Sequence, residues 1–180
     1  MKKTLRTFWL ELCLSARILL AAFLRSAGIT GGEITPVGRL FAVHMRNGQV
    51  VADLGLVSTK VVTTAGVGYI VDAFQNSVEL ENMKYHGSGT GTGSEASADT
   101  ALGTEVESRA TGTTTEGASA NIYRTVGTVA YTGTRAVTEH GVFSASTSGV
   151  LLDRSVFSAI NVISGDSIQF TYELTLPAGS

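Results

Sequence analysis

The chain has 180 residues, 43% of them hydrophobic, so it is long enough to bury a core and too apolar to be disordered by composition. Its formal net charge of −2 creates no field that attracts nucleic acid, and we expect no specific nucleic-acid partner. A single cysteine, Cys13, excludes an internal disulfide and any zinc site built on cysteines. Small polar residues (23 Thr, 17 Ser and 21 Gly) are abundant, which is typical of sheets joined by many turns.

The first element in chain order is a predicted amphipathic helix over residues 3–26. Its apolar residues recur at spacings of three and four, and Gly28 stands where helices commonly end. Residues 1–28 hold five basic side chains against Glu11, a net charge of +4, which leaves −6 for the rest. The apolar stripe consists of Leu5, Phe8, Trp9, Leu12, Ala16, Leu19, Leu20 and Phe23.

Three roles are open for this helix: packing on its own domain, docking on a neighbouring subunit, and lying on a membrane surface. Glu11 and Arg17 interrupt the apolar stretch, which argues against a signal peptide. They also argue against a transmembrane span, where each central charge costs about 2–3 kcal/mol. We expect residues 1–32 to form a helical arm and hinge, with a membrane role as a secondary alternative. The predicted protein-interaction residues are Leu5, Phe8, Trp9, Leu12, Leu19, Leu20 and Phe23.

Residues 33–180 are expected to form a second unit, which begins with a hairpin. Asn47-Gly48 separates strand-like residues 39–46 and 49–56, and this dipeptide accepts the positive φ angles of a tight primed turn. A further strand is predicted over 59–64, then one short helix over 65–75 capped by Thr63 or Thr64. Val67, Ile70, Val71 and Phe74 would share one face of that helix.

A short strand is predicted over residues 83–86, followed by a Gly/Thr-rich loop near 87–107. The loop has glycines but no Gly-Lys-Ser/Thr, so it fits neither a P-loop nor a dinucleotide fingerprint. We interpret it as a flexible or surface-draped loop.

The C-terminal half predicts antiparallel strands over 121–131, 136–145, 151–156 and 167–176. In the last of these Ile168, Phe170, Tyr172, Leu174 and Leu176 alternate with Gln169, Thr171, Glu173 and Thr175. Such period-two alternation indicates strands with one apolar and one wet face. The expected fold class is mainly β: an antiparallel β-sandwich, jelly-roll-like, with an N-terminal helical arm and one short helix.

Candidate catalytic residues do not stand out in the sequence. His44, His86 and His140 fall in separate predicted strands without ligand-like spacing, and we interpret them as surface or packing residues. Glu139 and His140 are adjacent, so they should point to opposite faces of a sheet. Cross-strand ion pairs would account for Arg124, Arg135, Glu139, Asp153 and Arg154. We therefore expect no enzyme activity, no cofactor and no metal.

Six segments of the chain form a further pattern: Gly89-Thr90-Gly91-Thr92, 99–105 (DTALGTE), 138–143 (TEHGVF), 149–157 (GVLLDRSVF), 160–162 (INV) and 165–174 (GDSIQFTYEL). Together these segments resemble small virion proteins of tailed bacteriophages. The resemblance covers about residues 83–176 and leaves out the N-terminal helix. It carries no active-site residues.

This resemblance implies a virion structural protein on the capsid surface, made in the host cytoplasm, that stabilises the shell as a cement or decoration protein. Its partners would be the major capsid protein and other copies of itself. The alternatives are a tail, fibre or adaptor component, and a carbohydrate-binding receptor module or hydrolytic β-domain. The membrane role of the basic helix adds a fourth class, a lipid-binding protein.

Overall fold

The computed structural model describes residues 34–59 and 61–178, and these contain a two-sheet body between Pro36 and Pro177. The predicted arm, with Leu5, Phe8, Trp9, Leu12, Leu19, Leu20 and Phe23, lies outside the described residues. Within the body, the prediction of a mainly β protein with two antiparallel sheets is confirmed.

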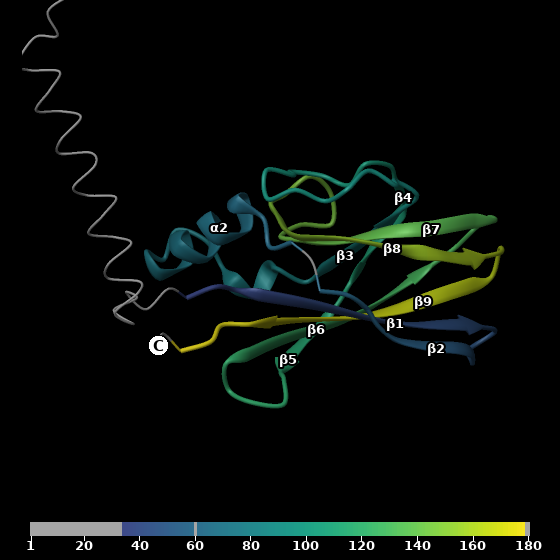
Figure 1. Cartoon of the computed structure of the whole chain (residues 1–180), viewed down its shortest axis with the longest axis horizontal. Helices are drawn as coiled ribbons and strands as arrows, with labels where there is room; N and C mark the ends of the chain where they lie inside the picture. The colour runs from purple at the N-terminus through teal and green to yellow at the C-terminus, as the bar shows by residue number, and fades with distance from the viewer. Residues whose placement is uncertain (1–33, 60, 179–180) are drawn as a thin grey trace, which may run out of the picture. The chain divides into compact units, whose positions relative to one another are not determined.

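Nine strands form the two sheets (Figure 1). One sheet has the order β2-β1-β9-β6-β5 and the other the order β4-β3-β7-β8. All strand pairs are antiparallel. The strands are β1 (Val37–Arg46), β2 (Gln49–Ser58), β3 (Tyr85–Gly89), β4 (Glu105–Thr111), β5 (Thr113–Glu116), β6 (Ile122–Ala130), β7 (Arg135–Phe143), β8 (Leu151–Val162) and β9 (Asp166–Thr175).

The predicted hairpin is confirmed as β1 and β2. Asn47 and Gly48 have φ angles of 49° and 74°, both positive as a primed two-residue turn requires. The pairing of β1 with β2 contains three register shifts, whereas β1 pairs with β9 in unbroken register. The outer strand of the hairpin is therefore the irregular one.

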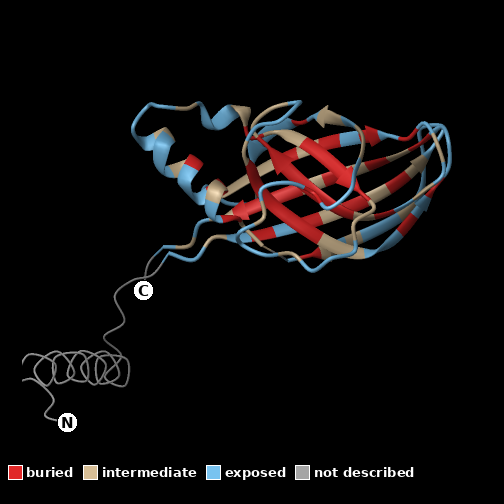
Figure 2. Cartoon of the chain, turned by 90° about the horizontal axis from the view of Figure 1, so that it is seen from above, coloured by how far each residue is buried: buried red, intermediate tan, exposed pale blue. Residues whose placement is uncertain are grey.

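The core lies between the two sheets, where Figure 2 shows continuous buried stretches on the strands. Strand β9 contributes Ile168, Phe170, Tyr172 and Leu174, which are all buried, so the predicted apolar face is confirmed there. Leu176 follows β9 and remains 39% exposed. On the opposite face Glu173 is also buried, because Arg124 of β6 covers it at 2.7 Å.

The predicted short helix is confirmed as α2 (Thr64–Phe74), and Thr63 caps it by accepting a hydrogen bond from the Gly66 amide at 2.9 Å. The buried residues of α2 are Gly66 and Tyr69, whereas Val67, Val71 and Phe74 are exposed. Gly66 packs so closely on the Leu152 backbone that an added Cβ would lie 2.7 Å from it. With Gly66 against the body, Val67, Val71 and Phe74 of the predicted apolar face point outward, whereas Ile70 is half-buried and packs against the core.

Several elements differ from the sequence predictions. Residues 59–64 contribute one isolated bridge, Val62 to Asp153, in place of a strand. The strand expected at 83–86 is shifted to 85–89, after a short 3-10 turn, η1 (Leu80–Asn82). Strand β8 runs to Val162, beyond the predicted end at 156, and strands β4 and β5 were not predicted. Polar sequences such as Thr113–Glu116 become strands because a neighbour, here β6, supplies the hydrogen-bond ladder.

Candidate functional site

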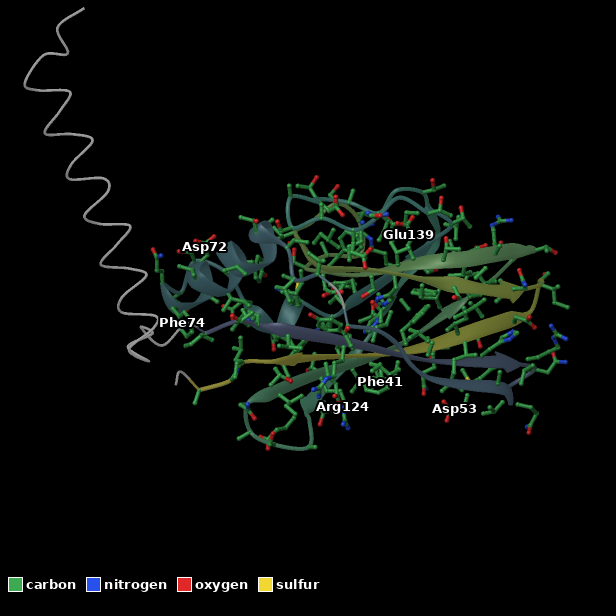
Figure 3. All side chains as sticks on the ribbon, viewed as in Figure 1. Phe41, Asp53, Asp72, Phe74, Arg124 and Glu139 are labelled. Atoms are coloured by element: carbon green, nitrogen blue, oxygen red, sulfur yellow. The ribbon has the colours of Figure 1, made fainter. Side chains whose placement is uncertain are left out.

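The most elaborate polar cluster of the body surrounds Glu139 on β7. This side chain is fully buried and accepts hydrogen bonds from three backbone amides of the Gly/Thr-rich loop. The donors are Gly91 and Thr104 to Oε1, at 2.9 and 2.7 Å, and Gly103 to Oε2 at 2.9 Å. Figure 3 shows Glu139 beneath this loop, on the outer side of the four-stranded sheet. The loop is thus draped on the sheet and fixed by one carboxylate.

Arg154 on the neighbouring strand β8 completes the cluster. Its Nε and Nη2 donate to Glu139 Oε2 at 3.0 and 2.8 Å, and its Nη1 donates to Asp99 at 2.9 Å. It also donates to the Gly93 carbonyl at 3.1 Å. Because one guanidinium joins β7, β8 and two points of the loop, the cluster works as a structural clamp. We call Glu139, Arg154 and Asp99 the loop clamp.

The ionisation of the loop clamp follows from these contacts. Burial by itself would raise the pKa of Glu139, but the amides of Thr104 and Gly103, then Arg154 and Gly91, outweigh it and lower that pKa. Glu139 is therefore ionised at neutral pH with both oxygens occupied by donors. A carboxylate in this state is poorly suited to act as a general acid or base.

Glycine is required in this loop where it passes over the carboxylate. A Cβ at Gly91 would lie 2.8 Å from Glu139 Cδ, and one at Gly89 would lie 2.9 Å from its Cγ. The glycine run, interpreted from the sequence as part of a flexible or surface-draped loop, is thus explained by close packing on one buried acid. No pattern in the sequence predicts this contact between residues 91 and 139.

Two histidines meet between the sheets, which the sequence interpretation missed. His86 Nδ1 lies 3.0 Å from His140 Nε2, and His86 Nε2 lies 3.1 Å from the Thr125 hydroxyl. Both rings are fully buried, and His140 also packs on Phe170 with ring centroids 4.4 Å apart. Burial lowers the pKa of His86 to about 3 and lowers the pKa of His140 well below its usual value. The pair is neutral and closed to solvent. Glu139 and His140 do lie on opposite faces of the sheet, as predicted.

The prediction of a cross-strand ion pair is wrong for Asp153 on β8. Burial raises the pKa of its carboxyl well above the usual value, and Ser155 donates a hydrogen bond to it at 3.0 Å. The Tyr172 hydroxyl is close to this carboxyl without meeting hydrogen-bond geometry, and burial, then Asp153, raises its pKa as well. Arg124 and Arg135, by contrast, face Glu173 and Glu107 from other strands.

A third cluster ties the hairpin to the start of β9. Arg46 donates to both oxygens of the buried Asp166 at 2.7 and 2.9 Å, and the His44 ring lies 2.9 Å from the same carboxylate. The hydrogen bond from Arg46 is the main reason why the pKa of Asp166 lies well below its usual range. This carboxylate, like Glu139, is saturated by its neighbours.

Within residues 34–59 and 61–178, no group of three or more His, Cys, Asp or Glu side chains could hold a metal ion. No helix among the described residues has the length and apolar character to cross a membrane.

Two surfaces of the body are more informative. The first is a groove of about 480 Å³ between the edge strands of the two sheets. Apolar side chains such as Leu56 of β2 and Phe157 of β8 lie there beside polar ones such as Asn161. The second, which we call the α2 patch, consists of exposed side chains on α2, η1 and the residue after β9. Its members are Val67, Val71, Phe74, Leu80 and Leu176.

Comparison with known proteins does not place the chain. No protein family, no curated protein and no solved structure matches it.

Proposed function

We propose that this chain is a virion structural protein that binds and stabilises a tailed-phage capsid shell as a cement or decoration protein. Its body would be a jelly-roll-like sandwich, and residues 1–32 a helical arm. The major capsid protein and other copies of the chain would be its partners. The resemblance of residues 83–176 to small phage virion proteins supports this proposal.

The observation that carries the proposal is the contrast between the polar clusters and the apolar surfaces. The carboxylates of Glu139 and Asp166 are saturated by structural hydrogen bonds, and the buried histidine pair is closed to solvent. At the same time the body exposes large apolar side chains on β2 and on α2, with Leu56 50% and Phe74 82% exposed. Exposed apolar patches of this kind mark protein–protein interaction sites.

A decoration protein needs this combination. It must add binding energy between shell subunits without chemistry, and a rigid sandwich with apolar surfaces does so by burying area. The predicted arm would extend the bound area, since the large apolar side chains of its stripe stabilise association by about 1.5–3 kcal/mol each when fully buried.

Binding to shells tests the proposal. Deleting residues 1–28 should abolish attachment to expanded shells of the phage's major capsid protein, while circular dichroism of the body stays unchanged. A second test compares two single substitutions in the same binding assay. Leu12→Asp changes the predicted apolar stripe, and Thr7→Asp adds the same charge on the opposite face of the predicted helix. We expect Leu12→Asp to lower occupancy and Thr7→Asp to leave it intact.

Two outcomes would contradict the proposal. One is unchanged occupancy of shells by the deleted chain. The other is a copy number per particle of only a few chains in a ring or trimer, which would assign the chain to a tail or fibre instead.

A further inference from the structure

Helix α2 has an apolar side that nothing in the described part of the chain covers. Its inner side, with Gly66 and Tyr69, packs on the body, while Val67, Val71 and Phe74 point outward at spacings of four and three. Asp72 is the one charged residue of the helix. A helix that is apolar on both sides is normally buried, so the outer side calls for a partner.

The α2 patch continues beyond the helix. Leu80 on η1 and Leu176 after β9 are both exposed, and together with Ile70 they line an apolar hollow of about 120 Å³. Tyr123 and Met83 form part of its lining. Figure 2 shows the exposed character of the helical end of the body. The patch therefore combines a highly exposed aromatic side chain, Phe74, with an apolar recess that includes Ile70 of the same helix.

Acidic residues neighbour the members of this patch along the chain. Asp72 follows Val71, and Glu79 and Glu81 stand on either side of Leu80; all three are exposed. Figure 3 shows Asp72 and Phe74 on opposite sides of α2. The one basic side chain among residues 64–84 is Lys84, which is half-buried. A partner that matches the patch is therefore apolar and basic.

The N-terminal segment of the chain has this chemistry. Its predicted stripe, from Leu5 to Phe23, is apolar, and residues 1–28 carry a net charge of +4. A helix over residues 3–26 would be about 36 Å long, more than enough to cover α2. The nine residues from 27 to 35 connect it to the body and can extend over about 30 Å, enough to reach a neighbouring molecule.

We propose that the α2 patch is the docking site for the N-terminal helix of a second copy of this chain. The apolar stripe would pack against Val71, Phe74 and Leu80, and the basic residues would face Asp72, Glu79 and Glu81. This inference rests on the proposed function, in which copies lie side by side on a shell, and it names the surface that joins them.

The self-association of the purified full-length chain tests this assignment. We expect a concentration-dependent oligomer by analytical ultracentrifugation, weakened at least about tenfold by Phe74→Asp, because an aromatic side chain at the centre of an interface dominates its affinity. Val50→Asp is the matched control, since Val50 is 63% exposed on β2, away from the patch. An oligomer weakened by Val50→Asp and untouched by Phe74→Asp would overturn the proposal, as would a chain that stays monomeric.

Cys13 allows the arm to be located directly, because it is the only cysteine of the chain. A thiol-linked photo-crosslinker on Cys13 should react with peptides from residues 64–84. In an equilibrated mixture of ¹⁴N- and ¹⁵N-labelled chains, these products should include pairs of mixed label. Products confined to single-label pairs would place the arm on its own body, and products at β2 would place it on the groove; either result overturns the proposal.

The electrostatic contribution to self-association can be measured separately. Raising the salt concentration from 0.05 to 0.5 M should weaken the oligomer of the natural chain, since exposed charges are screened within about 10 Å at 0.1 M. Replacing Asp72, Glu79 and Glu81 by their amides should remove most of this salt dependence, and an unchanged dependence would contradict the assignment. These measurements need no shell, so failure here and failure to bind shells are separate results.

Discussion

The loop clamp gives the sharpest test of how this body is held together. We consider Glu139→Gln, which keeps the shape of the side chain and removes its charge. Five donor contacts converge on the natural carboxylate: two on Oε1 and three on Oε2. A glutamine has one acceptor oxygen, so in either orientation its NH₂ group faces at least two of these donors.

The magnitude follows from those unpaired donors. Each buried donor left unsatisfied costs about 1–3 kcal/mol, and removing one partner of a buried ion pair costs about 3–5 kcal/mol. We therefore expect Glu139→Gln to lower the free energy of unfolding by about 3–5 kcal/mol, a large part of the roughly 5–15 kcal/mol of a natural domain. The matched control is Glu105→Gln, whose partly exposed ion pair with Arg109 should be worth less than about 1 kcal/mol.

Urea unfolding followed by circular dichroism measures the global effect, and hydrogen exchange measures the local one. Exchange of the Gly91, Gly103 and Thr104 amides should be at least about a hundredfold faster in Glu139→Gln, because their acceptor is lost. A loss below about 1 kcal/mol with unchanged exchange at these amides would refute the clamp.

The difference in free energy of unfolding between the natural chain and Glu139→Gln should depend on pH in a definite direction. The folded-state pKa of Glu139 is lowered, so its contribution is complete above the unfolded carboxyl value of about 4.3. It is lost as the pH falls through the lower folded value. The stability gap between the natural chain and Glu139→Gln should therefore narrow below about pH 4.

Three further predictions concern buried groups. His86 and His140 are neutral in the fold, whereas unfolded histidines bind protons below about pH 6.5, so the free energy of unfolding should fall from pH 6.5 toward pH 3. His140→Gln should reduce the slope of this fall between pH 6 and 4.5 by about 1.4 kcal/mol per pH unit, measured by urea unfolding at each pH. An unchanged slope would contradict a neutral histidine pair. Because the pKa of Asp153 is raised in the fold, its contribution to stability is complete below the unfolded pKa of about 3.9 and declines as the pH rises. At pH 8, Asp153→Asn should therefore melt at or above the melting temperature of the natural chain. A large drop in melting temperature would show that the charge is needed. Gly127→Ala places a Cβ 2.7 Å from His86 Cγ and should lower the free energy of unfolding by about 1–3 kcal/mol. In the control, Gly68→Ala in α2, the added Cβ meets no neighbour within 4 Å, and the free energy of unfolding should rise by about 0.5–1 kcal/mol. Equal melting temperatures for the two variants would refute this packing.

The sequence alone determined the elements whose signals are local. Strand β9 was predicted from its alternation, and its four inward apolar residues are buried. The hairpin was predicted from Asn47-Gly48, since only residues that tolerate positive φ fit that turn. A threonine cap was likewise predicted before the apolar helical run, and the structure selects Thr63 from the two candidates, Thr63 and Thr64. The jelly-roll arrangement and the N-terminal arm stay predictions.

Tertiary structure decided the features that depend on distant residues. The four-stranded sheet brings Glu139 under the amides of residues 91, 103 and 104, and it brings His86 beside His140 across 54 positions of sequence. The inward face of α2 is set by the Leu152 backbone, against which Gly66 packs so closely that a Cβ there would lie 2.7 Å away. Periodicity reports which residues share a face, but burial depends on which element arrives opposite that face. Helix α2 therefore exposes Val67, Val71 and Phe74, although the sequence pattern placed them on one apolar face with Ile70, which packs on the core.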